Sequence, residues 1–257
     1  MTAFFNHEGF DLAYVDRAPD AGGAAEPVLL IHGFASSLEV NWVGPGWVKT
    51  LAQAGYRVIA FDNRGHGRSS KSYEPADYAP EKMAGDAAAL LRHLGIGRAH
   101  VMGYSMGARI SAFLALAEPA LVATLVFGGL GIGMVDGVGE WDPIAEALTA
   151  ADPSTITHAR GKTFRTFADQ TKSDRRALAA CIMTSRTLLS EDEVARIAQP
   201  TLVAVGTTDD VGGSPAELAA LMPNAEAFDI VGRDHMLSVG DRTFKKRALE
   251  FWAAHPL

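Results

Sequence analysis

Short apolar runs alternate along most of the chain with longer segments of helical periodicity, and this rhythm limits the possible folds more than any other feature. Runs rich in Val, Ile and Leu with no polar face are typical of parallel strands that helices cover on both sides. The sequence therefore predicts an α/β fold with a mostly parallel central sheet and helices on both faces. The predicted strands are 10–17, 28–31, 57–61, 100–103, 123–127 and 201–205, and the predicted helices are 48–54, 80–94, 106–116, 215–221 and 243–252.

The alternation stops between residue 131 and about residue 197, where polar, helix-compatible segments occur without a buried-strand run. The segment 128–133 contains several glycines that permit a sharp turn at its start, and Gln199-Pro200 marks the return to the sheet. We therefore expect a core domain formed by 1–130 and 198–257, with a helical cap inserted at 131–197.

Composition and charge narrow the functional classes. The chain has 257 residues, 48% of them hydrophobic and 21% charged, which is enough apolar material for a sizeable core. Its net charge of −7 and the lack of a long basic run argue against a nucleic-acid partner. The first ten residues show no secretory leader, and no uninterrupted apolar stretch reaches about 18 residues, so we expect a cytoplasmic protein that does not enter a membrane.

The single cysteine, Cys181, rules out an intramolecular disulfide and predicts a small core residue. Thiolate zinc sites, phosphate-binding loops and dinucleotide fingerprints have no convincing match, so we expect no cofactor and no metal. The expected partner is a small-molecule substrate, and the oligomeric state stays open.

The strongest local motif is Gly103-Tyr104-Ser105-Met106-Gly107, which follows a predicted strand and begins a predicted helix. Glycines on either side of such a turn allow a close backbone approach that exposes the serine hydroxyl above the helix N-terminus. This context makes Ser105 the candidate nucleophile.

A serine hydroxyl is weakly nucleophilic at neutral pH, so it needs a base and an acid that orients the base. Asp209 follows the predicted strand 201–205, and His235 follows the apolar run 227–231. Both lie beyond strand ends, where an open α/β sheet forms its active-site crevice. We therefore predict Ser105, Asp209 and His235 as the catalytic residues, with the adjacent Asp210 as the alternative to Asp209.

Acyl transfer also needs backbone amides that stabilise the oxyanion. The amide of Met106 is one candidate, and that of Phe34, in His32-Gly33-Phe34 after a predicted strand, is the other. We expect His32 to support this loop. The polar, glycine-containing segment 62–69 follows another strand and is interpreted as a hydrogen-bonded structural turn behind the site.

Together these motifs resemble the series found in α/β-hydrolase-fold enzymes, over nearly the whole chain except the insertion. The resemblance implies an α/β-hydrolase fold and fits small carboxylesterases and lactonases; it identifies a superfamily better than a substrate. Dehalogenases and epoxide hydrolases are similar but have Asp in place of Ser105, which argues against both. The expected reaction is cleavage of an ester, lactone or thioester through an acyl-enzyme.

Two other functions stay open. A carbon-carbon bond hydrolase or lyase could use the same residues. Arg109 follows the Gly103–Gly107 motif, which resembles the menaquinone-pathway lyase, although Arg109 is equally compatible with a helix surface. A ligand-binding receptor on a hydrolase scaffold is the third possibility, because fold alone does not settle function.

The predicted cap carries many basic residues, which would suit an acidic substrate. We favour the alternative that they form a solvated helix face paired with 191–193. Aromatic and Met residues of the cap are compatible with an apolar pocket but equally with ordinary packing: Met134, Trp141, Phe164, Phe167 and Met183.

Overall fold

The computed structural model describes residues 2–22, 25–137 and 139–257. Its centre is an eight-stranded sheet with the order β1-β2-β4-β3-β5-β6-β7-β8. The two N-terminal strands form a hairpin, β2 pairs antiparallel with β4, and every other pairing is parallel. The strands are β1 (Ala3–His7), β2 (Phe10–Arg17), β3 (Pro27–Ile31), β4 (Arg57–Phe61), β5 (Ala99–Tyr104), β6 (Val122–Gly128), β7 (Thr201–Gly206) and β8 (Ala225–Ile230).

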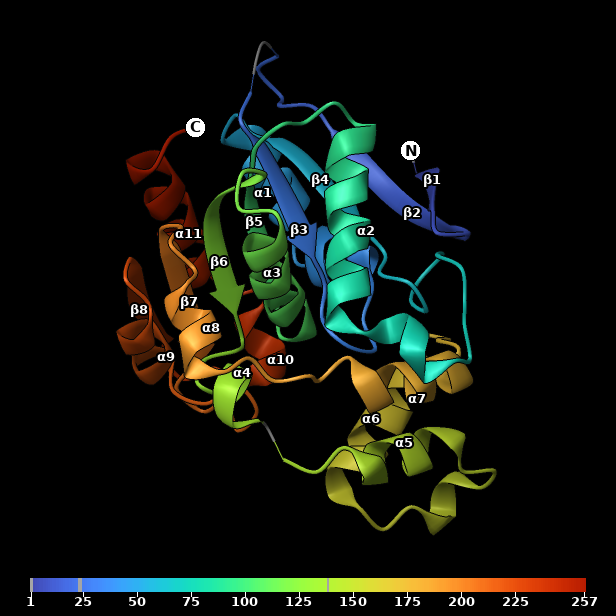
Figure 1. The fold of residues 1–257 in the computed structure, drawn as a ribbon. Helices are drawn as coiled ribbons and strands as arrows, with labels where there is room; N and C mark the ends of the chain where they lie inside the picture. The colour runs from blue at the N-terminus through green and yellow to red at the C-terminus, as the bar shows by residue number, and fades with distance from the viewer. Residues whose placement is uncertain (1, 23–24, 138) are drawn as a thin grey trace.

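Helices cover both faces of this sheet (Figure 1). The main ones are α1 (Trp47–Gln53), α2 (Pro80–His93), α3 (Met106–Ala117), α9 (Pro215–Leu221) and α11 (Arg242–Ala254); short elements are η1 (Glu39–Val43), η2 (Pro75–Tyr78) and α10 (His235–Ser238). The parallel strand β3 shows why both faces need cover. Its Leu29 and Ile31 belong to the apolar cluster under α2 and α3, whereas Val28 and Leu30 belong to the cluster under α1 and α11. The fold class predicted from the sequence is confirmed.

The six predicted strands all occur, and their ends differ by a residue or so. The sequence interpretation missed β1 and recognised only part of β8. Both are edge strands whose side chains are mostly exposed, so they lack the continuous apolar run that marks a buried strand.

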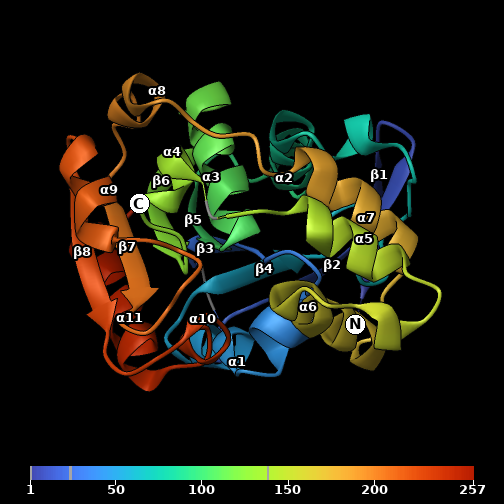
Figure 2. The ribbon, with the colours of Figure 1, turned by 90° about the horizontal axis from the view of Figure 1, so that it is seen from below.

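The segment 131–197 contains helices and no strand among its described residues. Its elements are α4 (Gly133–Asp136), α5 (Asp142–Thr149), η3 (Pro153–Thr155), α6 (Ala159–Gln170), α7 (Arg175–Thr184) and α8 (Glu191–Ala195). Helices α5, α6 and α7 pack against one another beyond the carboxyl ends of the strands (Figures 1 and 2). We call these three helices the α5–α7 bundle. Helix α4 lies just past the end of β6, and α8 packs against α9.

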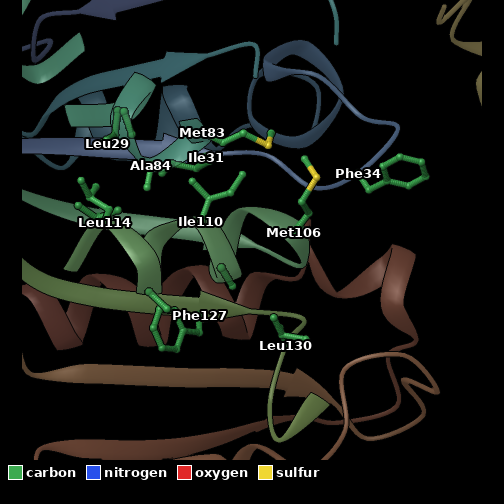
Figure 3. Close-up of a cluster of buried hydrophobic side chains, with 14 of the residues drawn as sticks. Leu29, Ile31, Phe34, Met83, Ala84, Met106, Ile110, Leu114, Phe127 and Leu130 are labelled. Atoms are coloured by element: carbon green, nitrogen blue, oxygen red, sulfur yellow. The ribbon is translucent and has the colours of Figure 1, made fainter. Parts of the chain in front are cut away.

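The larger apolar cluster extends from the sheet to the edge where the strands end. Figure 3 shows Ile31, Ile110 and Phe127 inside this cluster, with Met106 and Phe34 at the end to which the strand arrows point. Cys181 is fully buried in the same cluster, which confirms its prediction as a core residue. None of the helices in the described part of the chain is long and apolar enough to cross a membrane.

Candidate active site

Ser105 lies on a sharp turn between β5 and α3. Its φ of 54° is a left-handed backbone conformation that non-glycine residues rarely adopt. A Cβ atom at Gly103 would lie 2.1 Å from the carbonyl oxygen of Gly107, and one at Gly107 would lie 2.0 Å from that of Ile31. Only glycine fits at either position, so the two motif glycines are required by the close approach of β3, β5 and α3.

The three candidate catalytic side chains form a continuous hydrogen-bonded chain. The His235 Nδ1 lies 2.8 Å from Asp209 Oδ2, and the His235 Nε2 lies 3.0 Å from Ser105 Oγ. The Asp209 side chain is fully buried, while 14% of the His235 side chain is exposed. Segments far apart in the sequence therefore place a carboxylate, an imidazole and a hydroxyl in line.

Asp209 is held as a carboxylate by its surroundings. Burial opposes its ionisation, but hydrogen bonds from His235 and from the backbone amides of Gly212 and Val211 outweigh this, and the pKa of Asp209 lies below its ordinary value. An ionised acceptor on Nδ1 leaves the proton on that nitrogen and the lone pair of Nε2 facing Ser105. Asp210, by contrast, is largely exposed and its carboxylate lies 3.6 Å from Arg160.

The position of His235 is fixed through its backbone and its ring. Asp234 caps the short helix α10 by accepting hydrogen bonds from the amides of Met236 and Leu237. The Tyr104 hydroxyl donates to the His235 carbonyl at 2.5 Å, and the centroids of the two rings are 5.5 Å apart. Tyr104, the residue before the serine, therefore links the turn between β5 and α3, which we call the elbow, to the loop that carries His235.

Two other histidines stabilise the loop after β3. The Asn63 amide donates to His32 Nε2, and the Ala35 amide donates to His66 Nε2. The opposite nitrogen of each ring donates to a backbone carbonyl. Burial lowers the pKa of His32 to about 4 and that of His66 to about 3, so both rings are neutral at neutral pH.

The segment 62–69 forms the hydrogen-bonded turn that the sequence predicted. The buried Asp62 accepts from the amides of Leu38 and Arg68, and Ser69 Oγ donates to the Asp62 carbonyl. A Cβ at Gly67 would lie 2.2 Å from the Asp62 carboxylate, so glycine is required there as well. This turn supports the His32 loop and carries no residue of the hydrogen-bonded chain.

Both predicted oxyanion donors lie beside the serine. Met106 is the first residue of α3, so its amide has no partner inside the helix. The Phe34 amide donates no hydrogen bond within the described residues. A Cβ at Gly33 would lie 3.4 Å from Ser105 Cβ, which shows how closely the Phe34 loop approaches the elbow.

A cavity of about 820 Å³ opens at this point. Ser105, His235 and Tyr104 contribute to its floor, while residues of α6 and the segment before α5 contribute to the opposite side. Its size matches the clefts that hold small-molecule ligands.

Aromatic side chains from the segment 131–197 line the cavity. Trp141, Phe164 and Phe167 are among its lining residues, and the Phe164 ring lies 5.5 Å from that of Phe34 and 6.3 Å from that of Trp141. From the sequence these residues were compatible with either a pocket wall or ordinary packing, because spacing alone does not separate the two. Met134 is instead a buried core residue, and Met183 is exposed on another surface.

The expected ionic partners of the basic residues were wrong. Arg165 and Arg175 pair with Asp169, and Arg186 pairs with Asp142, all within the segment itself. Residues 191–193 instead begin α8, where Glu193 forms a capping box with Ser190. Arg160 lines the cavity.

Arg109 is buried and does not lie on a helix surface. Its guanidinium donates to the carbonyls of Gly133, Met134 and Thr187, and burial lowers its pKa to about 10. These carbonyls belong to the two segments that connect the sheet with the α5–α7 bundle. Arg109 therefore joins both connections to α3, which a sequence pattern could not reveal.

The described residues contain no group of three or more His, Cys, Asp or Glu side chains arranged to hold a metal ion. The site chemistry that the structure offers is that of the serine, the imidazole, the carboxylate and the adjacent amides.

Comparisons with known proteins agree with this fold. Over 146 residues the chain is 39% identical to the dihydrolipoyllysine-residue acetyltransferase component of the acetoin cleaving system of Cupriavidus necator, covering 57% of this chain and 34% of that protein. Over 151 residues it is 34% identical to epoxide hydrolase B of Mycobacterium tuberculosis, covering 56% and 41%. The matches thus span less than half the length of these relatives.

Solved structures match over nearly the full chain. A hydrolase from Pseudomonas aeruginosa is 26% identical with a TM-score of 0.78, and the match covers 97% of each chain. An enol-lactonase from Burkholderia xenovorans shares the fold, with 22% identity, a TM-score of 0.79 and coverage of 98% and 100%. The family model for the alpha/beta hydrolase fold matches residues 26–175, more than half of the sequence, and the chain therefore belongs to the α/β-hydrolase fold family.

Proposed function

We propose that this protein is a serine hydrolase that cleaves a carboxylic ester, or a related lactone or thioester, of a small molecule through an acyl-enzyme. The observation that carries the proposal is the chain from Asp209 through His235 to Ser105, with contacts of 2.8 and 3.0 Å, at the floor of a cavity. Those distances lie within the range for a nucleophile and its base.

In the first step Ser105 Oγ attacks the substrate carbonyl carbon while His235 Nε2 accepts the hydroxyl proton. The buried carboxylate of Asp209 stabilises the imidazolium and keeps the Nδ1 proton in place. His235 then returns the proton to the leaving alcohol as the carbonyl-oxygen bond breaks. Water attacks the acyl-enzyme with His235 again as base, which releases the acid and restores Ser105.

The developing oxyanion requires donors that are already oriented. We assign this function to the amide of Met106, at the start of α3, and to the amide of Phe34, in the loop after β3. The positive end of the α3 dipole adds to the stabilisation at Met106. Loss of one such donor costs about 3 kcal/mol in comparable sites.

The walls of the cavity favour a substrate with an apolar part. Trp141, Phe164 and Phe167 present aromatic surface opposite the serine, which we assign to the acyl chain. The segment 131–197 is thus a cap over the site. Serine at the elbow also argues against an epoxide-hydrolase activity like that of the mycobacterial relative.

The sequence feature that favoured a carbon-carbon hydrolase or lyase does not belong to the cavity. Arg109 was the feature that favoured it, and this side chain is bound to backbone carbonyls and is absent from the described residues that line the cavity.

The deciding experiment is hydrolysis of p-nitrophenyl esters from acetate to decanoate by wild type and Ser105→Ala, with fluorophosphonate labelling of both. We expect labelling and turnover to disappear together in the variant, with turnover falling by several orders of magnitude. A Ser105→Ala protein that keeps most of its activity would refute the mechanism. Labelling of Ser105 without turnover of any ester would instead favour the lyase, carbon-carbon hydrolase or receptor alternatives.

A further inference from the structure

Asn41 lies in the π-helical turn η1 and is among the residues that line the cavity, although it is only 7% exposed. π-helical turns occur frequently at functional sites. The mechanism above does not use this side chain.

The side-chain oxygen of Asn41 has a clear structural function. Its Oδ1 accepts a hydrogen bond from the Gly33 amide at 2.8 Å, and only the oxygen of the side chain can accept from an N–H group. The bond therefore fixes the orientation of the side chain and restrains Gly33, the residue before Phe34. A Cβ at Gly33 would lie 3.6 Å from Asn41 Oδ1 and 3.4 Å from Ser105 Cβ, so Asn41 and Ser105 flank the same glycine.

The side-chain nitrogen of Asn41 is a donor without a partner among the described residues. Asn41 Nδ2 has no hydrogen bond within the described part of the chain, and it is not among the fully enclosed unpartnered atoms, so it keeps access to the cavity. Its neighbour in the cavity lining, Ser36, carries a buried hydroxyl that likewise has no partner among the described residues. Buried polar groups are nearly always satisfied in folded proteins, and each exception requires an explanation such as a catalytic function or a bound water or ion. An acceptor atom of a substrate in the cavity would satisfy the Asn41 donor.

We propose that Asn41 acts on both sides of its amide: Oδ1 positions the Gly33–Phe34 segment, and Nδ2 donates to an acceptor oxygen of the substrate beside the scissile carbonyl. The inference rests on the proposed serine hydrolase function and narrows its substrate class. The preferred substrates are esters that carry an additional ether or carbonyl oxygen near the scissile group, in the acyl or the alcohol half.

The test compares ester pairs of nearly equal shape that differ in one oxygen. The first pair is p-nitrophenyl methoxyacetate and p-nitrophenyl butanoate, and the second is 2-methoxyethyl butanoate and butyl butanoate. Each rate is divided by that of hydroxide with the same ester, which removes intrinsic reactivity. We expect wild type to prefer the ether member of at least one pair by about two- to tenfold in kcat/KM, as one neutral hydrogen bond allows.

Three variants separate the two functions of the amide. Asn41→Asp keeps an acceptor for the Gly33 amide but, as a carboxylate, has no donor, so the preference for the ether member should disappear. Asn41→Leu lacks both groups, so it should lose the preference and turn over all four esters more slowly, because Gly33 is no longer restrained. Ser36→Ala removes the neighbouring hydroxyl and should keep the preference, which assigns the donor to Asn41.

The outcomes distinguish this inference from the function on which it rests. Equal Ser105-dependent rates within both pairs for wild type would overturn the assignment of Asn41 and leave the hydrolase intact. An unchanged preference in Asn41→Asp and Asn41→Leu would also overturn it, since the amide would then be structural only. Turnover that persists in Ser105→Ala would refute the hydrolase mechanism itself, and the Asn41 inference with it.

Discussion

The two walls of the cavity are built in different ways. On the sheet side, the elbow and the loop after β3 are fixed by backbone contacts so close that a single added Cβ at Gly103 or Gly107 would overlap a neighbouring main chain. On the other side, α6 and the segment before α5 approach the cavity through side chains, such as Phe164 against Phe34. Backbone contacts tolerate no change, whereas side-chain contacts can be exchanged for others of similar volume.

The connections to the two walls differ as well. Arg109 binds the two segments that lead to and from the α5–α7 bundle, so these segments are attached to α3. Beyond that point, the ion pair between Arg160 and Asp210 is partly exposed and adds little stability. Backbone contacts of the fold thus hold Ser105 in place, whereas side-chain contacts hold the opposite wall of the cavity.

The largest expected effect concerns the sheet-side wall. Asp209→Asn should lower kcat by about 10⁴-fold, because an amide partner favours the wrong tautomer of His235 and does not stabilise its imidazolium. Steady-state kinetics on the best p-nitrophenyl ester measures this. The matched control is Asp210→Asn, which should change kcat by no more than about twofold, as expected for an exposed ion pair. Similar losses in both variants would contradict the assignment of Asp209.

The second prediction tests the backbone contact directly. Gly107→Ala should destabilise the fold by more than about 4 kcal/mol or prevent folding, because its Cβ would lie 2.0 Å from the Ile31 carbonyl oxygen. Gly97→Ala is the control, since a Cβ there meets nothing within 4 Å. Urea unfolding followed by circular dichroism gives the free energy of unfolding for both. A folded Gly107→Ala protein of wild-type stability would show that the elbow tolerates more than its contacts indicate.

The third prediction is a pH dependence that arises from the sheet-side loops. The folded protein holds His32 and His66 neutral, with pKa values of about 4 and 3, whereas the unfolded chain protonates them near pH 6.5. The unfolded state therefore binds more protons as the pH falls below 6.5, and the free energy of unfolding should fall by up to about 1.4 kcal/mol per pH unit for each histidine.

Urea titrations between pH 7 and pH 4.5 measure this slope. His66→Gln should flatten it, because it removes one of the two histidines that the folded protein keeps neutral. A slope that does not respond to His66→Gln would place its origin elsewhere.

The smallest expected effect concerns the cavity wall formed by α6 and the segment before α5. Phe164→Ala should reduce the preference for longer over shorter acyl chains by about tenfold in kcat/KM, because lost apolar contact changes selectivity by about 1–3 kcal/mol. Labelling of Ser105 by a small fluorophosphonate should be little changed. Phe164→Leu keeps most of the volume and should keep most of the preference. An unaltered chain-length profile in Phe164→Ala would show that the acyl chain does not contact this wall.

The sheet-side wall was largely predictable from sequence. Ser105 lies between two required glycines, and the strands before Ser105 and Asp209 are buried on both faces, so their patterns are strong and local. The edge strands β1 and β8 were harder to predict, because exposed side chains leave no such pattern. Trp141, Phe164 and Phe167 were noticed but not selected, since aromatic spacing does not state which neighbours a helix has.

The α/β fold and the turn at Ser105 follow from the sequence alone, because they depend on a repeating apolar pattern and on glycines at fixed spacing. The candidate acid and base were placed by their positions after predicted strands. Three contacts became visible only in the folded chain: that of Asp209, and not Asp210, with His235, that of Arg109 with the backbone of both connections, and that of Asn41 with Gly33 next to Ser105. Those contacts join residues whose partners are distant in the chain or whose orientation depends on packing. No local pattern encodes them, since they form only when separate loops meet at the edge of the sheet.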